Sequence, residues 1–130
     1  MKAKIGSNGP RQEALLKECR AKLVETRQDI LNRVRSAKKE FATLDKSGGD
    51  EADQTMSLLA EHDFLSSQQR LTELLIEIDL ALARIDTGKY GVCEETEEPI
   101  ESERLLAIPW TRLSIEGAEI REAMQRKYAR

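Results

Sequence analysis

Cys93 opens the one spacing in this 130-residue chain that resembles a metal site. It is followed by Thr96, Ser114 and Gly117 at the positions of the other ligands in a four-cysteine zinc site, C-x2-C-x17-C-x2-C. Threonine, serine and glycine supply no thiolate, so three of the four ligands are missing. We therefore expect no zinc. We expect Cys93 to be a small buried hydrophobe, with the Thr96 and Ser114 hydroxyls capping backbone groups.

Asp50 and Asp53 form a second feature of chemical interest, because a spacing of three places both carboxylates on one side of a helix. Negative charge at a helix N-terminus explains them without any function. The functional interpretation is an acidic surface presented to a partner. The only histidine, His62, lies between Glu61 and Asp63 with no nucleophile at motif spacing, so we expect it to be exposed and the protein not to be an enzyme.

Composition limits the classes of protein that remain. Charged residues make up 35% of the chain, with 7 glycines and 3 prolines, which is typical of long solvated helices rather than of sheets. The net charge of -3 disfavours direct binding of nucleic acid. Two distant cysteines and the lack of a long apolar run predict a cytoplasmic protein that is neither exported nor membrane-spanning.

Apolar residues at steps of three and four predict two long helices after a flexible segment at residues 1–9. The apolar positions of the first helix, expected over 11–44, are Leu16, Cys19, Leu23, Ile30, Val34, Ala37, Phe41 and Leu44. Those of the second, ending at Gly88, are Phe64, Leu71, Leu75, Ile78, Leu82 and Ile85, with Gln68 at one heptad position. The short connection between the two helices predicts an antiparallel coiled-coil hairpin over 10–87 with its tip at 45–55.

Residues 88–130 change in pattern and predict a small globular region. We expect short strands at 90–93 and 110–113, and a last helix over 118–128 that is capped by Ser114. The residues expected to pack its interior are Val92, Ile100, Leu105, Ile108, Trp110 and Leu113. The predicted fold class is mainly α: a coiled-coil hairpin, a degenerate zinc-finger-like knob and a C-terminal helix.

Three segments resemble the DksA/TraR family of bacterial transcription factors, and the likeness extends without gaps from about Asp50 to Glu122. Residues 88–94, GKYGVCE, resemble the family's G-x-(Y/F)-G-x-C-E, and residues 104–109 and 119–122 resemble its R-L-x-A-x-P and A-E-I-R-E segments. Residues 50–53 resemble the start of its tip motif, D-x-x-D-x-A. The missing cysteines are similar to those of the cysteine-poor, zinc-independent DksA-like paralogues.

The resemblance implies a partner and a mechanism. Members of the family bind bacterial RNA polymerase without contacting DNA and insert the coiled coil into its secondary channel. They alter the stability of promoter complexes, repressing ribosomal RNA promoters in the stringent response, often together with the alarmone ppGpp. By this resemblance Asp50 and Asp53 are the effector residues, and the protein is expected to act as a monomer.

Two further departures from the family affect the expected activity. Thr55 stands where the tip motif has alanine, which implies weakened or retuned activity. The family's ppGpp site uses basic groups where this chain has Glu77, Ile108 and Ala118, while Arg70 and Leu74 keep their family types. We therefore expect a weakened ppGpp response, which Arg112 could compensate.

Two alternatives remain open from the sequence. The chain could be a structural coiled-coil adaptor that pairs with other helices. It could also be a Gre-like stimulator of transcript cleavage, which shares an acidic tip that helps to hold a metal ion.

Overall fold

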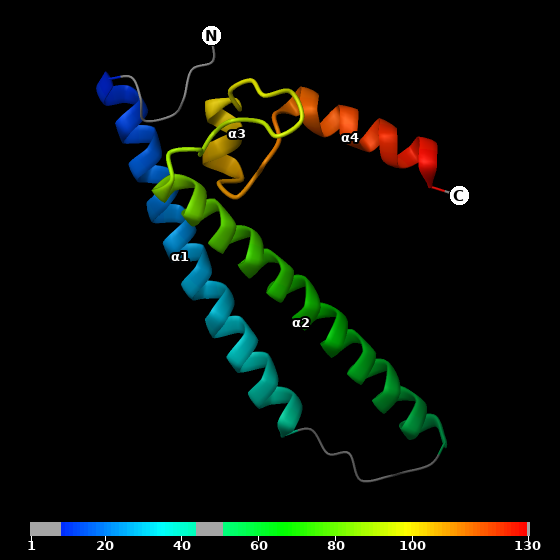
Figure 1. Cartoon of the computed structure of the whole chain (residues 1–130). Helices are drawn as coiled ribbons and strands as arrows, with labels where there is room; N and C mark the ends of the chain where they lie inside the picture. Colours follow the sequence, from blue (N-terminus) through cyan, green and yellow to red (C-terminus); the bar gives the residue numbers. More distant parts are fainter. Residues whose placement is uncertain (1–8, 44–50, 130) are drawn as a thin grey trace. The chain divides into compact units, whose positions relative to one another are not determined.

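The computed structural model describes residues 9–43 and 51–129. These residues form two long helices, α1 (Gly9–Ala42) and α2 (Glu51–Asp86), and two short ones, α3 (Ser102–Ala107) and α4 (Ile115–Tyr128) (Figure 1). The predicted mainly helical architecture with a long helical hairpin is thus confirmed. The expected flexible segment 1–9 (apart from Gly9), Leu44 and the whole connection at 45–50 lie outside the described residues.

The chain divides into two compact units, one of residues 1–25 and 77–130 and the other of residues 26–76. The division predicted from the sequence, with a hairpin over 10–87 and a separate region over 88–130, stays a prediction.

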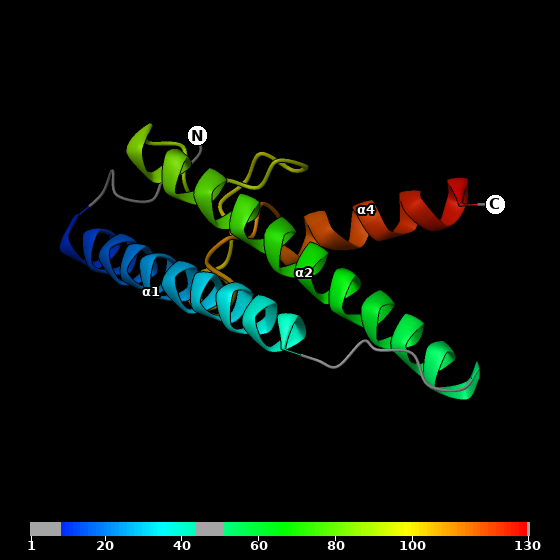
Figure 2. The same ribbon diagram turned by 90° about the horizontal axis from the view of Figure 1, so that it is seen from below.

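In the unit of residues 26–76, α1 and α2 run antiparallel (Figure 2). The rings of Phe41 and Phe64 stack at a centroid distance of 4.3 Å, and the Gln68 side-chain amide donates to the Val34 carbonyl oxygen at 3.4 Å. Moving back along α1 therefore moves forward along α2. Ile30 is buried in the same unit, so this contact follows the predicted apolar positions.

The other unit contains the larger core. From the long helices it buries Cys19, Leu23, Ile78 and Ala81, and from residues 88–117, here called the knob, it buries Tyr90, Cys93, Ile100 and Leu105. The Tyr90 hydroxyl donates to the Pro109 carbonyl oxygen at 2.7 Å, and the Cys19 thiol lies 3.7 Å from the Leu105 carbonyl oxygen. Cys19 thus fills the apolar interface of α1, as expected.

The predicted strands at 90–93 and 110–113 are wrong. In the described residues the only β pairing is an isolated antiparallel bridge between Val92 and Pro99, and residues 110–113 are a turn and irregular backbone. Gly91 has a φ of 87°, which turns the chain where a strand would continue straight. The six-residue helix α3 was not predicted, and α4 begins at Ile115 rather than at Ala118.

Candidate functional site: the knob and the hairpin end

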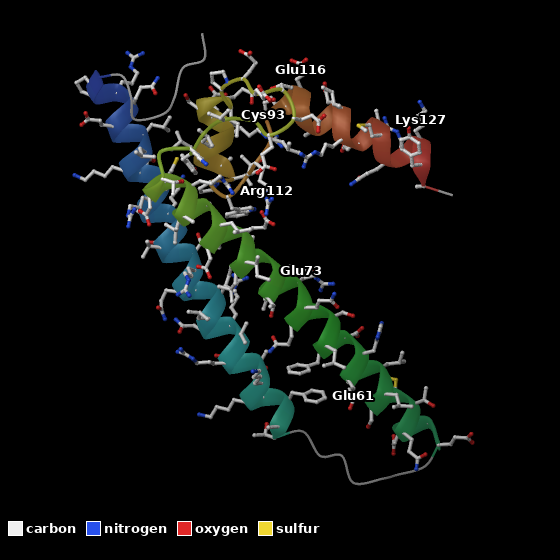
Figure 3. The ribbon with its side chains drawn as sticks, in the orientation of Figure 1. Glu61, Glu73, Cys93, Arg112, Glu116 and Lys127 are labelled. Atoms are coloured by element: carbon white, nitrogen blue, oxygen red, sulfur yellow. The ribbon has the colours of Figure 1, made fainter. Side chains whose placement is uncertain are left out.

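The knob begins where α2 stops at a glycine. Gly88 has a φ of 74°, and the Lys89 N–H donates to the Arg84 carbonyl oxygen at 2.9 Å, which closes the helix C-terminus. The following turn folds back on itself, because the Glu97 N–H donates to the Cys93 carbonyl oxygen and the Cys93 N–H donates to that of Glu98. These bonds hold the Cys93 side chain on the inner side of the turn, near the N-terminus of α4 (Figure 3).

The four positions with zinc-finger spacing lie together around one sulfur atom. The Thr96 N–H donates to the Cys93 Sγ at 3.5 Å, and the Ser114 side chain also hydrogen-bonds this thiol. Gly117 lies so close that a Cβ atom there would overlap the same sulfur. The fold therefore keeps the arrangement of a four-ligand site although three of the ligands are absent.

Cys93 is only 1% exposed, yet its surroundings favour the thiolate. Burial by itself raises the pKa of a thiol, but hydrogen bonds from Ser114 and Thr96 outweigh this effect and lower the pKa of Cys93 to about 7. The interpretation of Cys93 as a small buried hydrophobe is thus right about burial. It missed the polarity around the sulfur, which becomes visible only once the fold brings the two hydroxyls together.

The two hydroxyls also cap backbone groups, as predicted. The Ser114 Oγ accepts from the Gly117 N–H at 3.0 Å and so caps α4, and the Thr96 Oγ1 accepts from the Glu98 N–H at 3.3 Å. Each residue therefore serves both the thiol and the backbone.

These residues do not fit a zinc ion. One sulfur, two hydroxyls and a glycine cannot form the set of four cysteine or histidine ligands that structural zinc requires. In residues 9–43 and 51–129, no group of three or more His, Cys, Asp or Glu side chains is placed to hold a metal.

Charged side chains connect the knob to both helices that flank it. Arg112 forms ion pairs with Glu77 on α2 and with Glu94, and Arg121 on α4 forms ion pairs with Glu94 and Glu95. Figure 3 shows Arg112 on the segment between α3 and α4. The sequence points to Glu77 and Arg112 for another reason, and it does not reveal this connection, because no spacing rule links residues so far apart.

Arg84 is a second cation against the knob. Its guanidinium donates to the Trp110 carbonyl oxygen at 3.4 Å, and burial together with the nearby charge of Arg112 lowers its pKa. Arg84 and Cys93 contribute to the lining of one open hollow, which is completed by Lys89, Val92, Glu94 and Glu97.

The hairpin end is described only in part, because Asp50 lies outside the described residues. Asp53 is exposed in the first turn of α2. Thr55 is exposed too, and its hydroxyl donates to the Glu51 carbonyl oxygen at 3.1 Å. Farther along α2, Arg70 is exposed and Leu74 is half-buried.

The remaining predicted positions lie in the unit of residues 1–25 and 77–130 or carry no special chemistry. Ile108 and Ala118 are half-buried and uncharged. His62 on α2 is exposed, as expected. No helix within the described ranges combines the length and the apolar character that a membrane crossing needs.

A helical hairpin joined to a zinc-finger-like knob that retains one of four cysteines defines the structural class of this protein. Residues 88–126 match the prokaryotic dksA/traR C4-type zinc finger. The chain belongs to the DksA/TraR family. Its cysteine content is consistent with a cysteine-poor paralogue.

Named relatives agree with this assignment. The chain is 34% identical, over 81% of its own length and 74% of the relative's, to the RNA polymerase-binding transcription factor DksA of Caulobacter vibrioides. It is 32% identical to general stress protein 16O of Bacillus subtilis, over 80% and 69% of the two chains. The solved structure of transcription factor DksA2 from Pseudomonas aeruginosa superimposes with a TM-score of 0.77 at 36% identity, covering 88% of each chain.

Proposed function

We propose that this protein is a cytoplasmic, monomeric and non-enzymatic regulator that binds bacterial RNA polymerase and inserts the end of its hairpin into the secondary channel. There it would change the stability of promoter complexes and repress ribosomal RNA promoters. The similarity to the RNA polymerase-binding factor DksA over 81% of the chain is the observation that carries this proposal.

The position of the acidic end supports this mechanism. Asp53 lies in the first turn of a 36-residue helix, which spans about 54 Å at a rise of 1.5 Å per residue. A carboxylate at the end of such a helix can reach the interior of a narrow channel. It would have a larger effect there than on an open surface, because charges are screened less where water is excluded. We propose the same role for Asp50.

Thr55 would modify this activity. Its hydroxyl is bonded to its own helix, so the methyl group is the main addition to the surface relative to alanine. We propose that Thr55→Ala increases the effect on promoter complexes without changing polymerase affinity.

A transcription assay with purified polymerase tests the proposal. Asp53→Asn should abolish the effect on open-complex lifetime while competition with a known secondary-channel factor for polymerase stays within about twofold of wild type. Asp63→Asn is the matched control, because it makes the same change at an exposed site on the same helix. Failure of the wild-type protein to compete for polymerase, or full activity of Asp53→Asn, would overturn the mechanism. Transcript cleavage in stalled complexes would assign the tip to the Gre-like function instead.

We further propose that ppGpp acts weakly on this protein. Glu77 is acidic, and Ile108 and Ala118 offer no cation. Arg112 forms ion pairs with Glu77 and Glu94, so its guanidinium is not free to bind ppGpp in place of the missing basic groups. Arg70 and Leu74 alone would remain as contacts from the family's site.

A further inference from the structure

A zinc ion in a four-cysteine finger of this spacing would join two chain segments, residues 93–96 and residues 114–117. The residues present cannot hold that ion. The two segments nevertheless stay together, with Cys93 and Gly117 in contact distance of each other. Some other interaction must therefore supply the connection between the segments.

We propose that a chain of alternating charges replaces the metal as the link between the two halves of the knob. This charge chain consists of Glu77, Arg112, Glu94, Arg121 and Glu95. It joins the same two segments that the metal would join, because Glu94 and Glu95 belong to the first and the two arginines flank the second. Through Glu77 it extends to α2 as well.

The tightest link of the charge chain is at α2. The Arg112 Nε and Nη2 atoms donate to the two carboxylate oxygens of Glu77 at 2.8 and 3.0 Å. This planar two-bond pairing is the strongest that arginine makes with a carboxylate. The Arg112 Nη1 then lies 3.7 Å from a carboxylate oxygen of Glu94, so one guanidinium faces two elements.

Arg121 forms the second half of the charge chain from α4. Its Nε donates to a Glu95 carboxylate oxygen at 2.9 Å, and its Nη2 lies 3.8 Å from the other oxygen of Glu94. Glu94 is therefore shared by two arginines from opposite sides. A backbone bond lies at the same point, since the Glu94 N–H donates to the Arg112 carbonyl oxygen at 2.9 Å.

The connected arrangement is what distinguishes this link from ordinary surface ion pairs. Its side chains are between 28% and 42% exposed, so each pair alone is screened by water and contributes little. Five charges that fix one another lose less side-chain entropy per contact than separate pairs do. The link is nevertheless exposed enough to weaken with added salt, which a metal held by thiolates would not.

Native-state amide hydrogen exchange of the full chain tests the proposal independently of polymerase binding. Glu94→Gln and Arg121→Gln should each speed exchange of the backbone amide of residue 94, relative to its intrinsic rate, roughly fivefold, because opening of the knob costs less. The amide of Leu23, which is buried in α1 outside the knob, is the internal reference. Arg126→Gln is the matched control, because Arg126 is an exposed arginine five residues farther along α4.

Coupling and salt dependence separate the charge chain from packing. In the double variant Glu94→Gln/Arg121→Gln, the increase in exchange rate should be smaller than the product of the two single increases, since both substitutions remove the same contact. In about 1 M NaCl, where the Debye length is about 3 Å, the wild-type rate should approach that of the variants. A chelator should leave the wild-type rate unchanged.

Each opposite result counts against the charge chain. Single variants that match Arg126→Gln, or a wild-type rate insensitive to salt, would assign the connection to packing of the buried residues alone. Faster exchange with a chelator would assign it to a metal.

Discussion

Arg112 donates two hydrogen bonds to the carboxylate of Glu77, at 2.8 and 3.0 Å, and this pair joins the segment before α4 to α2. The bonds to Glu77, and the charges of Glu77 and Glu94, raise the pKa of Arg112 further above its ordinary value. The guanidinium therefore stays charged, but its charge is already balanced within the protein.

This pairing predicts how the response to ppGpp can be changed. Glu77→Lys should remove the two-bond partner of Arg112, leave only its longer pair with Glu94 at 3.7 Å, and add a second cation. The ppGpp concentration for half-maximal stimulation should therefore fall about tenfold, which corresponds to about 1.4 kcal/mol. Stimulation of promoter-complex dissociation in purified transcription measures it. Glu73→Lys, an exposed site one turn earlier on α2, is the control. A strong response of the wild-type protein would contradict the prediction.

Gly117→Ala should destabilise the protein, although alanine normally favours a helix over glycine. The new Cβ would overlap the Cys93 sulfur and lie 3.3 Å from the Glu95 Cβ. We expect a loss of about 1–3 kcal/mol in the free energy of unfolding, measured by urea denaturation. In the Cys93→Ala background the sulfur is gone, and the same substitution should cost much less. Equal costs in both backgrounds would show that the overlap is relieved elsewhere.

The lowered pKa of Cys93 predicts a pH-dependent contribution to stability. The folded value is about 7 against an ordinary value of 9.0, so between these pH values the unfolded state binds more protons. The free energy of unfolding of the wild type, relative to that of Cys93→Ser, should therefore be lowest below pH 7. It should grow by at most about 2–3 kcal/mol as the pH rises to 9.

The comparison with Cys93→Ser is needed because Cys19 acts in the opposite direction. Burial raises the pKa of Cys19, so ionisation of this thiol at alkaline pH destabilises the folded protein. The wild type and Cys93→Ser share this effect. Urea denaturation at several pH values gives the difference, and ultraviolet absorbance of the thiolate gives an independent titration. A difference that stays constant from pH 6 to pH 9 would show that the thiol is not acidified.

Gln68→Leu should stabilise the hairpin. Gln68 occupies an apolar heptad position, where its Oε1 is buried and has no hydrogen-bond partner among the described residues. Its amide makes one long bond to the Val34 carbonyl oxygen, at 3.4 Å. Leucine removes the unsatisfied oxygen and adds apolar contact, so we expect the free energy of unfolding, measured by thermal denaturation, to rise by about 1 kcal/mol. Gln69→Leu, at the exposed neighbour, should gain less. A loss of stability would mean that the amide bond matters more than the buried oxygen.

The sequence predicts the helices well because their signal is local. Apolar residues at steps of three and four place both long helices to within two residues where they are described, and Ser114 was predicted as the cap that it is. Helix α3 was missed because six residues are too few to show a period. The strands were predicted wrongly because Tyr90 resembles a strand residue, while its position is fixed by a distant bond to Pro109.

The candidate site was predictable only where a motif carries it. The positions of Cys93, Thr96, Ser114 and Gly117 follow from their spacing, and the structure brings them together. The pairing of Arg112 with Glu77 spans 35 residues, and no rule of helix or strand spacing links the two side chains. Such contacts depend on the tertiary fold, so they appear only in the structure.

The presence of one buried cysteine in place of four also changes the sensitivity of the knob to oxidation. Four clustered thiolates can be oxidised to disulfides in pairs, and the finger then loses its ion and its shape. Cys93 has no neighbouring cysteine at positions 96, 114 or 117, and it is 1% exposed. Peroxide therefore has no disulfide to form within the knob, and this fold should persist under oxidising conditions that dismantle a four-cysteine finger.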